Sequence, residues 1–170
     1  MSVVAVKKYK DKIVMAADSI AVSYGYLKTG ESLNRDKIFK TKEMIIGGSG
    51  SAFETAILQE FVKSHKPINA TDTDVLSFMI EFSDYLKSKI DVKSKNSYLM
   101  IYKGKIFEIH GVYVFEIKDF AAIGAGVESA LTALHLGCSP KEAVKVTCEI
   151  NCYTSEPIIE YEELLADEER

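Results

Sequence analysis

The order of predicted strands and helices constrains the fold of this chain more than any other feature of its sequence. Two blocks of short apolar strands are each followed by a pair of helices. The predicted order is β-β-β-β, α-α, β-β-β-β, α-α, β. Because the helices come in pairs, the order does not match the strict strand–helix alternation that builds parallel sheets. We therefore predict an α+β protein with antiparallel sheets.

The first two predicted strands, residues 3–6 and 13–17, are apolar at successive positions. A strand with one face in water alternates apolar and polar residues, whereas a continuously apolar strand is covered on both faces. Two sheets packed together, each covered outside by a helix pair, would bury strands in this way. The sequence therefore predicts a four-layer α-β-β-α sandwich, and we expect residues 1–170 to form a single domain.

Local signals indicate where the helices begin. Ser51 and Glu54 have the spacing of a capping box, Thr71 or Thr73 opens a second helix, and Ser139–Pro140 opens the last one. Apolar residues at helical spacing then predict the buried faces. These faces are Phe53, Ile57, Leu58, Phe61 and Val62 in the first helix and Val75, Leu76, Met79, Ile80, Phe82 and Leu86 in the second.

Short apolar segments predict the later strands. The second block is expected over residues 97–102, 105–109, 112–117 and 120–123, and a last strand over residues 157–161. The last strand begins with proline, which a sheet tolerates at its edge.

Composition narrows the class of protein. The chain of 170 residues has a net charge of −4, which gives no support for nucleic-acid binding. No apolar run has the length of a membrane span, and no signal-peptide pattern follows Met1, so we expect no membrane association and a cytoplasmic location. The three cysteines, an odd number, fit a reducing compartment.

Cys148 and Cys152 stand four residues apart on a predicted helix, with Cys138 and His135 nearby. A metal site and a set of buried thiols are the two interpretations of this group. The chain has no CxxC pair and no second ligand cluster, so buried thiols are favoured.

The opening hairpin carries two residues that suggest chemistry. Removal of Met1 would leave the hydroxyl of Ser2 beside a free α-amine at the start of a buried strand, and Asp18 lies where the second apolar run stops. Chain termini are normally loose and solvated, so a terminus at the start of a buried strand is unusual. We therefore expect a functional site at this end of the hairpin.

Six segments resemble one protein family and follow the family's order along the chain. They are Ser2–Lys8, Val14–Asp18, Lys37–Lys40, Ile46–Glu54, Ala122–Gly126 and Cys152–Ser155. These segments resemble proteasome β-subunits and especially the bacterial heat-shock protease HslV (ClpQ). The resemblance implies the N-terminal-nucleophile (Ntn) hydrolase fold, an α-β-β-α sandwich, and the activity of a threonine-type endopeptidase.

The resemblance also implies roles for four residues. Ser2 corresponds to the family's nucleophilic N-terminal Thr, Asp18 to its strand-end Asp, and Lys37 to its active-site Lys. Gly50 corresponds to the glycine whose N–H helps to form the oxyanion hole. The implied function is cleavage of peptide bonds by Ser2 after removal of Met1.

These residue types suit that chemistry. A hydroxyl needs a base, and an α-amine with a pKa of about 7.7–8 can be neutral near pH 7 and accept its proton. The charge of Lys37 would favour the neutral amine, and Asp18 would hold Lys37 in place and keep it charged. A backbone N–H aimed at the oxyanion commonly lowers the barrier by about 3–4 kcal/mol.

The resemblance further implies a homo-oligomeric ring that encloses the sites and receives unfolded polypeptide from an ATP-dependent unfoldase. No cofactor is required. The family segment that matches Cys148–Thr154 can bind Na⁺ or K⁺ through backbone carbonyls, so we expect Cys148, Asn151 and Thr154 to be the candidate ligands.

Two alternative functions stay open. Many members of the family have serine in the middle of the Gly-x-Gly at residues 124–126, where this chain has Ala125. This substitution fits a catalytically silent, ring-forming scaffold that retains Met1. The other alternative is an Ntn amidohydrolase acting on a small amide, although this compact chain shows no added loops for a small-molecule pocket.

Overall fold

The computed structural model describes residues 2–23, 26–28, 36–90 and 93–166 of the chain. The strands of the first half are β1 (Val3–Lys8), β2 (Lys12–Ala17), β3 (Ala21–Ser23), β4 (Tyr26–Lys28), β5 (Ile38–Lys40) and β6 (Met44–Ser49). Those of the second half are β7 (Ser97–Tyr102), β8 (Lys105–His110), β9 (Tyr113–Ile117), β10 (Phe120–Gly124) and β11 (Ile159–Leu164). The helices are α1 (Ala52–Phe61), α2 (Asp72–Lys89), α3 (Val127–His135) and α4 (Pro140–Ile150).

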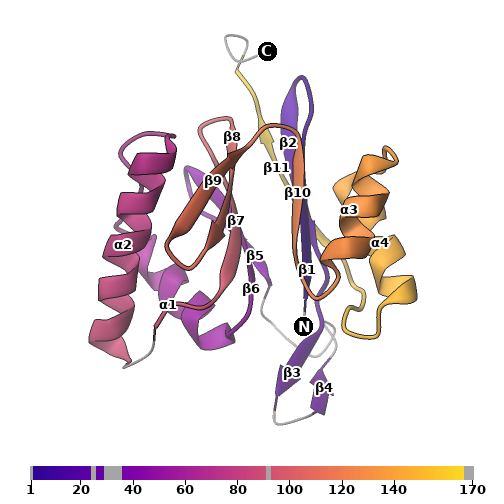
Figure 1. The fold of residues 1–170 in the computed structure, drawn as a ribbon, viewed down its shortest axis with the longest axis horizontal. Coiled ribbons are helices and arrows are strands. Elements are labelled where there is room, and N and C mark those ends of the chain that lie inside the picture. Colours follow the sequence, from indigo (N-terminus) through magenta and orange to yellow (C-terminus); the bar gives the residue numbers. More distant parts are fainter. Residues whose placement is uncertain (1, 24–25, 29–35, 91–92, 167–170) are drawn as a thin grey trace.

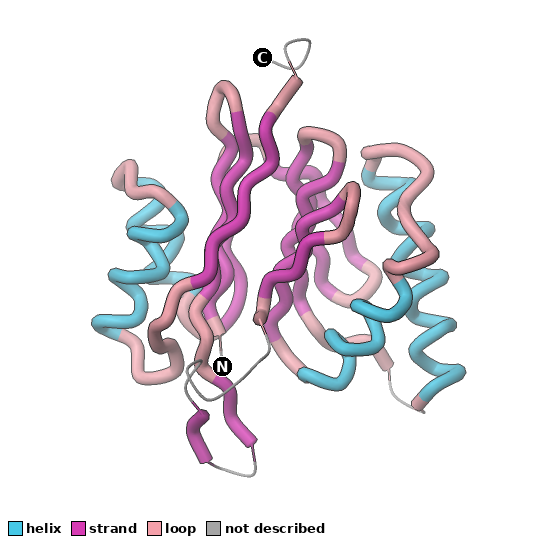
Figure 2. The backbone as a smooth tube through the Cα atoms, turned by 180° about the vertical axis from the view of Figure 1, so that it is seen from behind, coloured by secondary structure: helices cyan, strands magenta, loops and turns pink. Residues whose placement is uncertain are grey.

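Two antiparallel sheets lie face to face between two helix pairs, as Figures 1 and 2 show. One sheet has the order β10-β1-β2-β11 and the other β5-β6-β7-β8-β9, while β3 and β4 form a separate hairpin. Helices α1 and α2 cover the second sheet, and α3 and α4 cover the first. The predicted α-β-β-α sandwich is confirmed.

Strand β1 occupies the middle of its sheet and pairs with β2 on one side and β10 on the other. Val4 lies opposite Ala17 of β2, and Val3 lies opposite Gly124 of β10. The start of β1 is therefore flanked by the end of β2 and the end of β10. The proline-containing last segment forms an edge strand, as predicted, but β11 begins at Ile159 rather than at residue 157.

The continuous apolar pattern of β1 is explained by burial on both faces. Val4 and Val6 point between the two sheets, whereas Val3 and Ala5 point toward α3 and α4. Successive side chains of a strand face opposite sides, so each layer takes every second residue. The unbroken run thus reports a strand in the middle of a layered protein.

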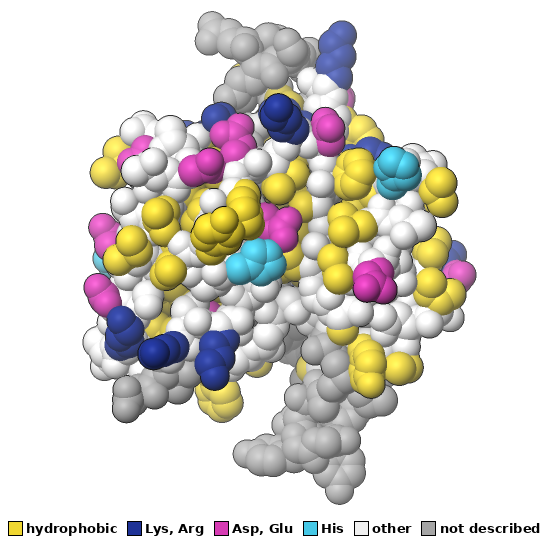
Figure 3. Space-filling view, viewed as in Figure 1, with side chains coloured by type: hydrophobic (Ala, Val, Ile, Leu, Met, Phe, Trp, Pro, Cys, Tyr) yellow, Lys and Arg dark blue, Asp and Glu magenta, His cyan; other side chains and the backbone are white. Residues whose placement is uncertain are grey.

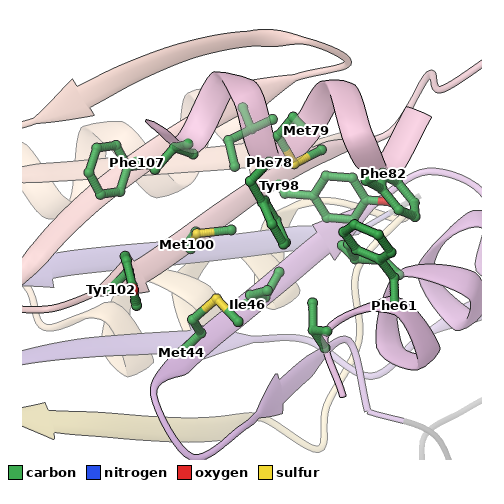
Figure 4. Packing of buried hydrophobic residues seen from close by; sticks show 14 of the residues in the cluster. Met44, Ile46, Phe61, Phe78, Met79, Phe82, Tyr98, Met100, Tyr102 and Phe107 are labelled. Atoms are coloured by element: carbon green, nitrogen blue, oxygen red, sulfur yellow. The ribbon is translucent and has the colours of Figure 1, made fainter. Parts of the chain in front are cut away.

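A core of large side chains fills the space between the second sheet and helices α1 and α2 (Figure 4). Phe61 of α1 lies 5.3 Å from Phe78 and 5.6 Å from Phe82 of α2, measured between ring centroids. From the sheet side, Tyr98, Met100 and other residues of β6–β8 complete the cluster. Ring contacts at these distances stabilise the packing beyond the area they bury.

The helix starts follow the predictions with one exception. Thr71 caps α2 by accepting from Asp74 N–H, and Ser139 with Glu142 forms a full capping box on α4. Ser51 is the N-cap residue of α1, but its side chain makes no capping hydrogen bond. The predicted box is wrong because the Glu54 carboxylate is buried and accepts hydrogen bonds from residues 94–98 instead.

Two residues assigned to apolar faces are in fact exposed. Phe53 is 80% exposed, because the buried stripe of α1 runs through Glu54, Leu58 and Phe61 and Phe53 lies about 100° away around the helix. In α2, Ile80 is half exposed, and Phe78, which the pattern did not include, is buried. Among the described helices, none is long and apolar enough to cross a membrane.

Candidate active site

Three of the four predicted catalytic residues meet at one end of the sandwich, the end from which the β3–β4 hairpin projects in Figure 1. Ser2 immediately precedes β1, Asp18 immediately follows β2, and Lys37 immediately precedes β5. Ser2 and Lys37 therefore come from different sheets. Asp18 connects these sheets through its side chain.

One carboxylate oxygen of Asp18 joins the two sides of the site. Asp18 is fully buried, and its Oδ1 accepts from the backbone N–H of Val3 at 2.8 Å and from Lys37 Nζ at 2.6 Å. The Asp18 N–H in turn donates to the carbonyl of Val3 at 3.2 Å. The Lys37 ammonium is thus held one shared acceptor away from the peptide group that follows Ser2.

The second oxygen of Asp18 ties in two further segments. Its Oδ2 accepts from Ile20 N–H at 3.2 Å and more weakly from Ser155 N–H at 3.4 Å. Ser19 also binds this C-terminal segment, donating its N–H to the Ser155 carbonyl at 3.0 Å and its hydroxyl to the Pro157 carbonyl. The part played by Ser19 and Ser155 in fixing Asp18 was not predicted. Its one sequence signal was that residues 152–155 belong to a segment that carries the family resemblance.

Burial and Asp18 act in opposite directions on the Lys37 ammonium. Burial lowers the pKa of the Lys37 ammonium below its usual value, although attraction to Asp18 and the hydrogen bond between them both oppose that shift. Removing an ammonium from water disfavours its charged form, and this effect is the largest here. Lys37 therefore gives up a proton more readily than a lysine on the surface.

Gly50 lies one residue past the end of β6, the strand that pairs with β5. The N–H of Gly48 donates to the Lys37 carbonyl at 3.0 Å. Backbone N–H groups point alternately to the two sides of a strand, so continued alternation past Ser49 would direct the N–H of Gly50 toward the same side as that of Gly48. Among the residues that the structure describes, none accepts from this N–H. The N–H of Gly50 is thus a candidate oxyanion donor.

Gly50 is also required by the backbone. Its φ is +134°, and a Cβ at this position would lie 2.1 Å from Asn96 Oδ1. A side chain would be strained in this conformation and would collide with a buried neighbour. The matching glycine in β10 is Gly124, with φ +101°, where a Cβ would lie 2.3 Å from the carbonyl oxygen of Ser2.

The backbone of Ser2 is held by the loop between β10 and α3. Gly126 donates its N–H to the Ser2 carbonyl at 3.2 Å. The residue between the two glycines, Ala125, contributes its carbonyl, which accepts from Asn151 Nδ2 at 3.0 Å. Ser2 itself is buried, whereas Met1 lies outside the described residues. The alternative in which Met1 is retained therefore stays open.

The three candidate cation ligands lie around the C-terminal end of α4. The Asn151 carbonyl accepts from both the N–H and the hydroxyl of Thr154, at 3.2 and 3.1 Å. These two bonds use the two lone pairs of that carbonyl. Within the described ranges, no group of three or more His, Cys, Asp or Glu side chains could hold a metal ion. The cation site through Cys148, Asn151 and Thr154 stays a prediction.

The cysteines are free but not uniformly buried. Cys138 and Cys148 are partly buried, and Cys152 is exposed, so the expectation of buried thiols is wrong for Cys152. Burial is the largest influence on Cys148 and, together with the charge of Asp18, raises the pKa of its thiol to about 11. The charge of Lys37 acts on this thiol in the opposite direction to that of Asp18.

No family model matches the sequence, and no curated protein matches it either. Solved structures do match. Thiobacillus denitrificans BPH in complex with epoxomicin superimposes with a TM-score of 0.88 at 19% identity, over 96% of this chain and 99% of that one. HslV from Trypanosoma brucei superimposes with a TM-score of 0.71 at 15% identity, over 94% of this chain and 98% of that one.

Anbu (ancestral beta-subunit) from Yersinia bercovieri gives a TM-score of 0.72 at 13% identity, over 94% of this chain and 80% of that one. At these identities the likeness establishes the fold and leaves activity open. Together with the two packed sheets and their helix pairs, it confirms the family resemblance at the level of architecture. The chain has the fold of the proteasome-type Ntn hydrolases.

Proposed function

We propose that the protein is a peptidase that cleaves peptide bonds with Ser2 as an N-terminal nucleophile once Met1 has been removed. The observation that carries this proposal is the shared oxygen of Asp18, which accepts from Val3 N–H and from Lys37 Nζ. This bond pattern holds the Lys37 ammonium one shared acceptor away from the peptide group that follows Ser2. Burying a Lys–Asp pair has a desolvation cost that the attraction between the charges often does not repay. Stability alone therefore explains this pair poorly, which supports a functional role.

The proposed reaction forms and breaks an ester. The Ser2 hydroxyl oxygen attacks the carbonyl carbon of the peptide bond, and its proton passes to the α-amine of Ser2. The N–H of Gly50 stabilises the oxyanion of the tetrahedral intermediate. The intermediate collapses when the C–N bond breaks and the proton moves to the departing amine. Water then hydrolyses the acyl ester on Ser2, and the hydroxyl and α-amine return to their starting states.

Lys37 supports this reaction through its charge. A cation near the nucleophile stabilises negative charge developing on the Ser2 oxygen and favours the neutral form of the α-amine. Asp18 positions the ammonium for both tasks.

The proposal includes a homo-oligomeric ring that encloses the sites and receives unfolded polypeptide from an ATP-dependent unfoldase. Exposed apolar side chains support such an assembly, and Figure 3 shows several on one face between the helix layers. Among the described residues, the most exposed of the large apolar side chains are Phe53, Ile68, Leu136, Leu164 and Ile150. Single exposed apolar residues are normal, so the native mass in solution is the test. A monomer at micromolar concentration would contradict the ring.

Turnover of fluorogenic peptide amides tests the nucleophile. Ser2→Ala should abolish turnover, whereas Ser2→Thr should retain it because a hydroxyl and an amine are still present. Ser64→Ala, which removes an exposed hydroxyl at the end of α1, is the matched control and should leave turnover unchanged. Full activity in Ser2→Ala would place the nucleophile elsewhere.

A further inference from the structure

The turn that carries Gly50 is held by the buried side chain of Asn96, the residue immediately before β7. Asn96 is 1% exposed, and its side-chain amide forms hydrogen bonds with both the N–H and the carbonyl of Ser51. Asn96 Oδ1 accepts from Ser51 N–H at 2.6 Å, and Asn96 Nδ2 donates to the Ser51 carbonyl at 2.9 Å. Thr55 Oγ1 accepts a further bond from Nδ2 at 3.1 Å. The paired bonds fix which end of the amide carries the oxygen.

This contact sets the peptide group next to the proposed oxyanion donor. The N–H of Ser51 is directed at Asn96, away from the Lys37 side, so it fixes the peptide plane that joins Gly50 to Ser51. A plane fixed on one side of Gly50, together with its φ of +134°, limits how the Gly50 N–H can be oriented. An oxyanion donor is effective only when it is aimed before the charge develops.

Asn96 is itself positioned by a buried carboxylate. Glu54 is 3% exposed and has turned away from the helix-capping role that its place in α1 would allow. Four donors bind it: Ser94 Oγ at 2.7 Å, Lys95 N–H at 3.0 Å, Asn96 N–H at 3.2 Å and Tyr98 OH at 3.2 Å. Together these bonds pin the segment that leads into β7. A carboxylate suits the position because it only accepts hydrogen bonds.

We propose that Glu54 and Asn96 are positioning residues that aim the N–H of Gly50 at the transition state. The inference rests on the proposed function, and neither residue touches substrate. Glu54 holds Asn96, Asn96 holds Ser51, and Ser51 sets the orientation of Gly50. Loosening any of these links weakens binding of the oxyanion while leaving ground-state binding of the peptide largely unchanged.

Steady-state kinetics of Glu54→Gln and Asn96→Asp with a peptide amide test the proposal. Glutamine would turn an NH₂ toward donors, and aspartate would turn a second acceptor toward the Ser51 carbonyl. Each variant should lower kcat by about 10- to 100-fold, since a misaligned oxyanion donor costs somewhat less than a removed one, and KM should change by less than about threefold. Glu60→Gln, on the exposed side of the same helix, is the matched control and should keep wild-type kinetics.

A lower kcat with an almost unchanged KM distinguishes a positioning residue from one with a purely structural role. General loosening of the protein would lower the folded fraction, which circular dichroism and the thermal midpoint report. If Glu54→Gln does not fold, the milder Thr55→Val, which removes one partner of Asn96, should still lower kcat in a folded protein. Wild-type kcat in the folded variants would overturn this inference and leave the proposed function intact. An inactive wild type that an inhibitor directed at N-terminal nucleophiles does not label would instead overturn the proposed function.

Discussion

The two helix–sheet interfaces of this protein are built from side chains of very different size. The layer under α1 and α2 contains Phe61, Phe78 and Phe82 with large residues of β6–β8. The layer under α3 and α4 consists mostly of alanine, contributed by both the sheet and the helices. The large-residue layer lies on the sheet that carries Gly50, and the small-residue layer lies on the sheet that carries Ser2.

The small side chains bring α4 close to the start of β1. A Cβ on Gly126 would lie 2.4 Å from Cγ2 of Thr147 in α4 and 3.0 Å from Cβ of Val3. The close approach allows the segment after α4 to reach Asp18 through Ser155. The comparison teaches that one interface supplies mainly hydrophobic stability, whereas the other brings a distant part of the chain to the site.

Truncation in the large-residue layer should have the largest effect. Phe82→Ala removes a fully buried ring and should lower the free energy of unfolding by about 3–5 kcal/mol. Urea denaturation measures this change. Phe53→Ala, which truncates an exposed ring, is the control and should stay within about 0.5 kcal/mol of wild type. Equal losses in the two variants would show that α1–α2 does not cover the core as described.

Enlargement in the small-residue layer should have the next largest effect. Ala130→Leu adds bulk to a fully buried position in α3 and should cost about 1–3 kcal/mol of stability by overpacking. It should also reduce peptidase activity in the protein that remains folded, because α3 and α4 would be pushed away from the sheet that carries Ser2. Ala52→Leu, at an exposed position in α1, provides the comparison. Unchanged stability in Ala130→Leu would contradict the close packing of this layer.

The Lys37–Asp18 pair should give the stability a pH dependence in the alkaline range. The pKa of Lys37 is lower in the folded protein than its usual value of 10.5, so the folded chain binds fewer protons between these two pKa values. Stability should therefore rise with pH across that window. Lys37→Met removes this contribution, and its curve should rise less than that of wild type.

Unfolding free energies measured from about pH 7 to about pH 10.5 would show this difference. Lys42→Met, at an exposed position, should follow the wild-type curve. A steeper alkaline rise in Lys37→Met than in wild type would contradict the assigned direction of the Lys37 pKa.

Thiol reactivity offers the smallest test of the comparison. Cys148 packs against the small-residue layer with its pKa raised to about 11, whereas Cys152 is exposed. Only a thiolate reacts quickly, so an alkylating reagent near neutral pH should modify Cys152 well before Cys148. Peptide mapping over time gives the order in which the thiols are modified. In Cys152→Ser the fast modification should be lost, and the slow modification should be unchanged. Faster modification of Cys148 would show that α4 does not shield this side of the site.

The sequence was sufficient for the layered fold because its signals are local and repeated. Continuous apolar residues in β1 and β2 reported burial on both faces, and the capping signals at Thr71 and Ser139 placed α2 and α4. The signal failed at Glu54, whose spacing from Ser51 predicted a local cap. The Glu54 carboxylate instead accepts hydrogen bonds from residues about 40 positions later in the chain.

The same limit applies to the site. Ser2, Asp18, Lys37 and Gly50 could be predicted because they match a family pattern at the ends of predicted strands. Asn96 and Ser155 act through hydrogen bonds between distant segments, and a lone Asn or Ser carries no periodic or motif signal. The lowered pKa of Lys37 was likewise beyond the sequence, because it depends on burial outweighing a visible partner charge.

The central claim is that Ser2 is a nucleophile with a free α-amine, and the mass of the intact protein tests it most directly. The purified chain should have the mass of residues 2–170, and an electrophilic inhibitor directed at N-terminal nucleophiles should add one equivalent that peptide mapping locates on Ser2. Ser2→Ala should not be labelled. A chain that retains Met1 and stays unlabelled would contradict the account and favour the silent scaffold.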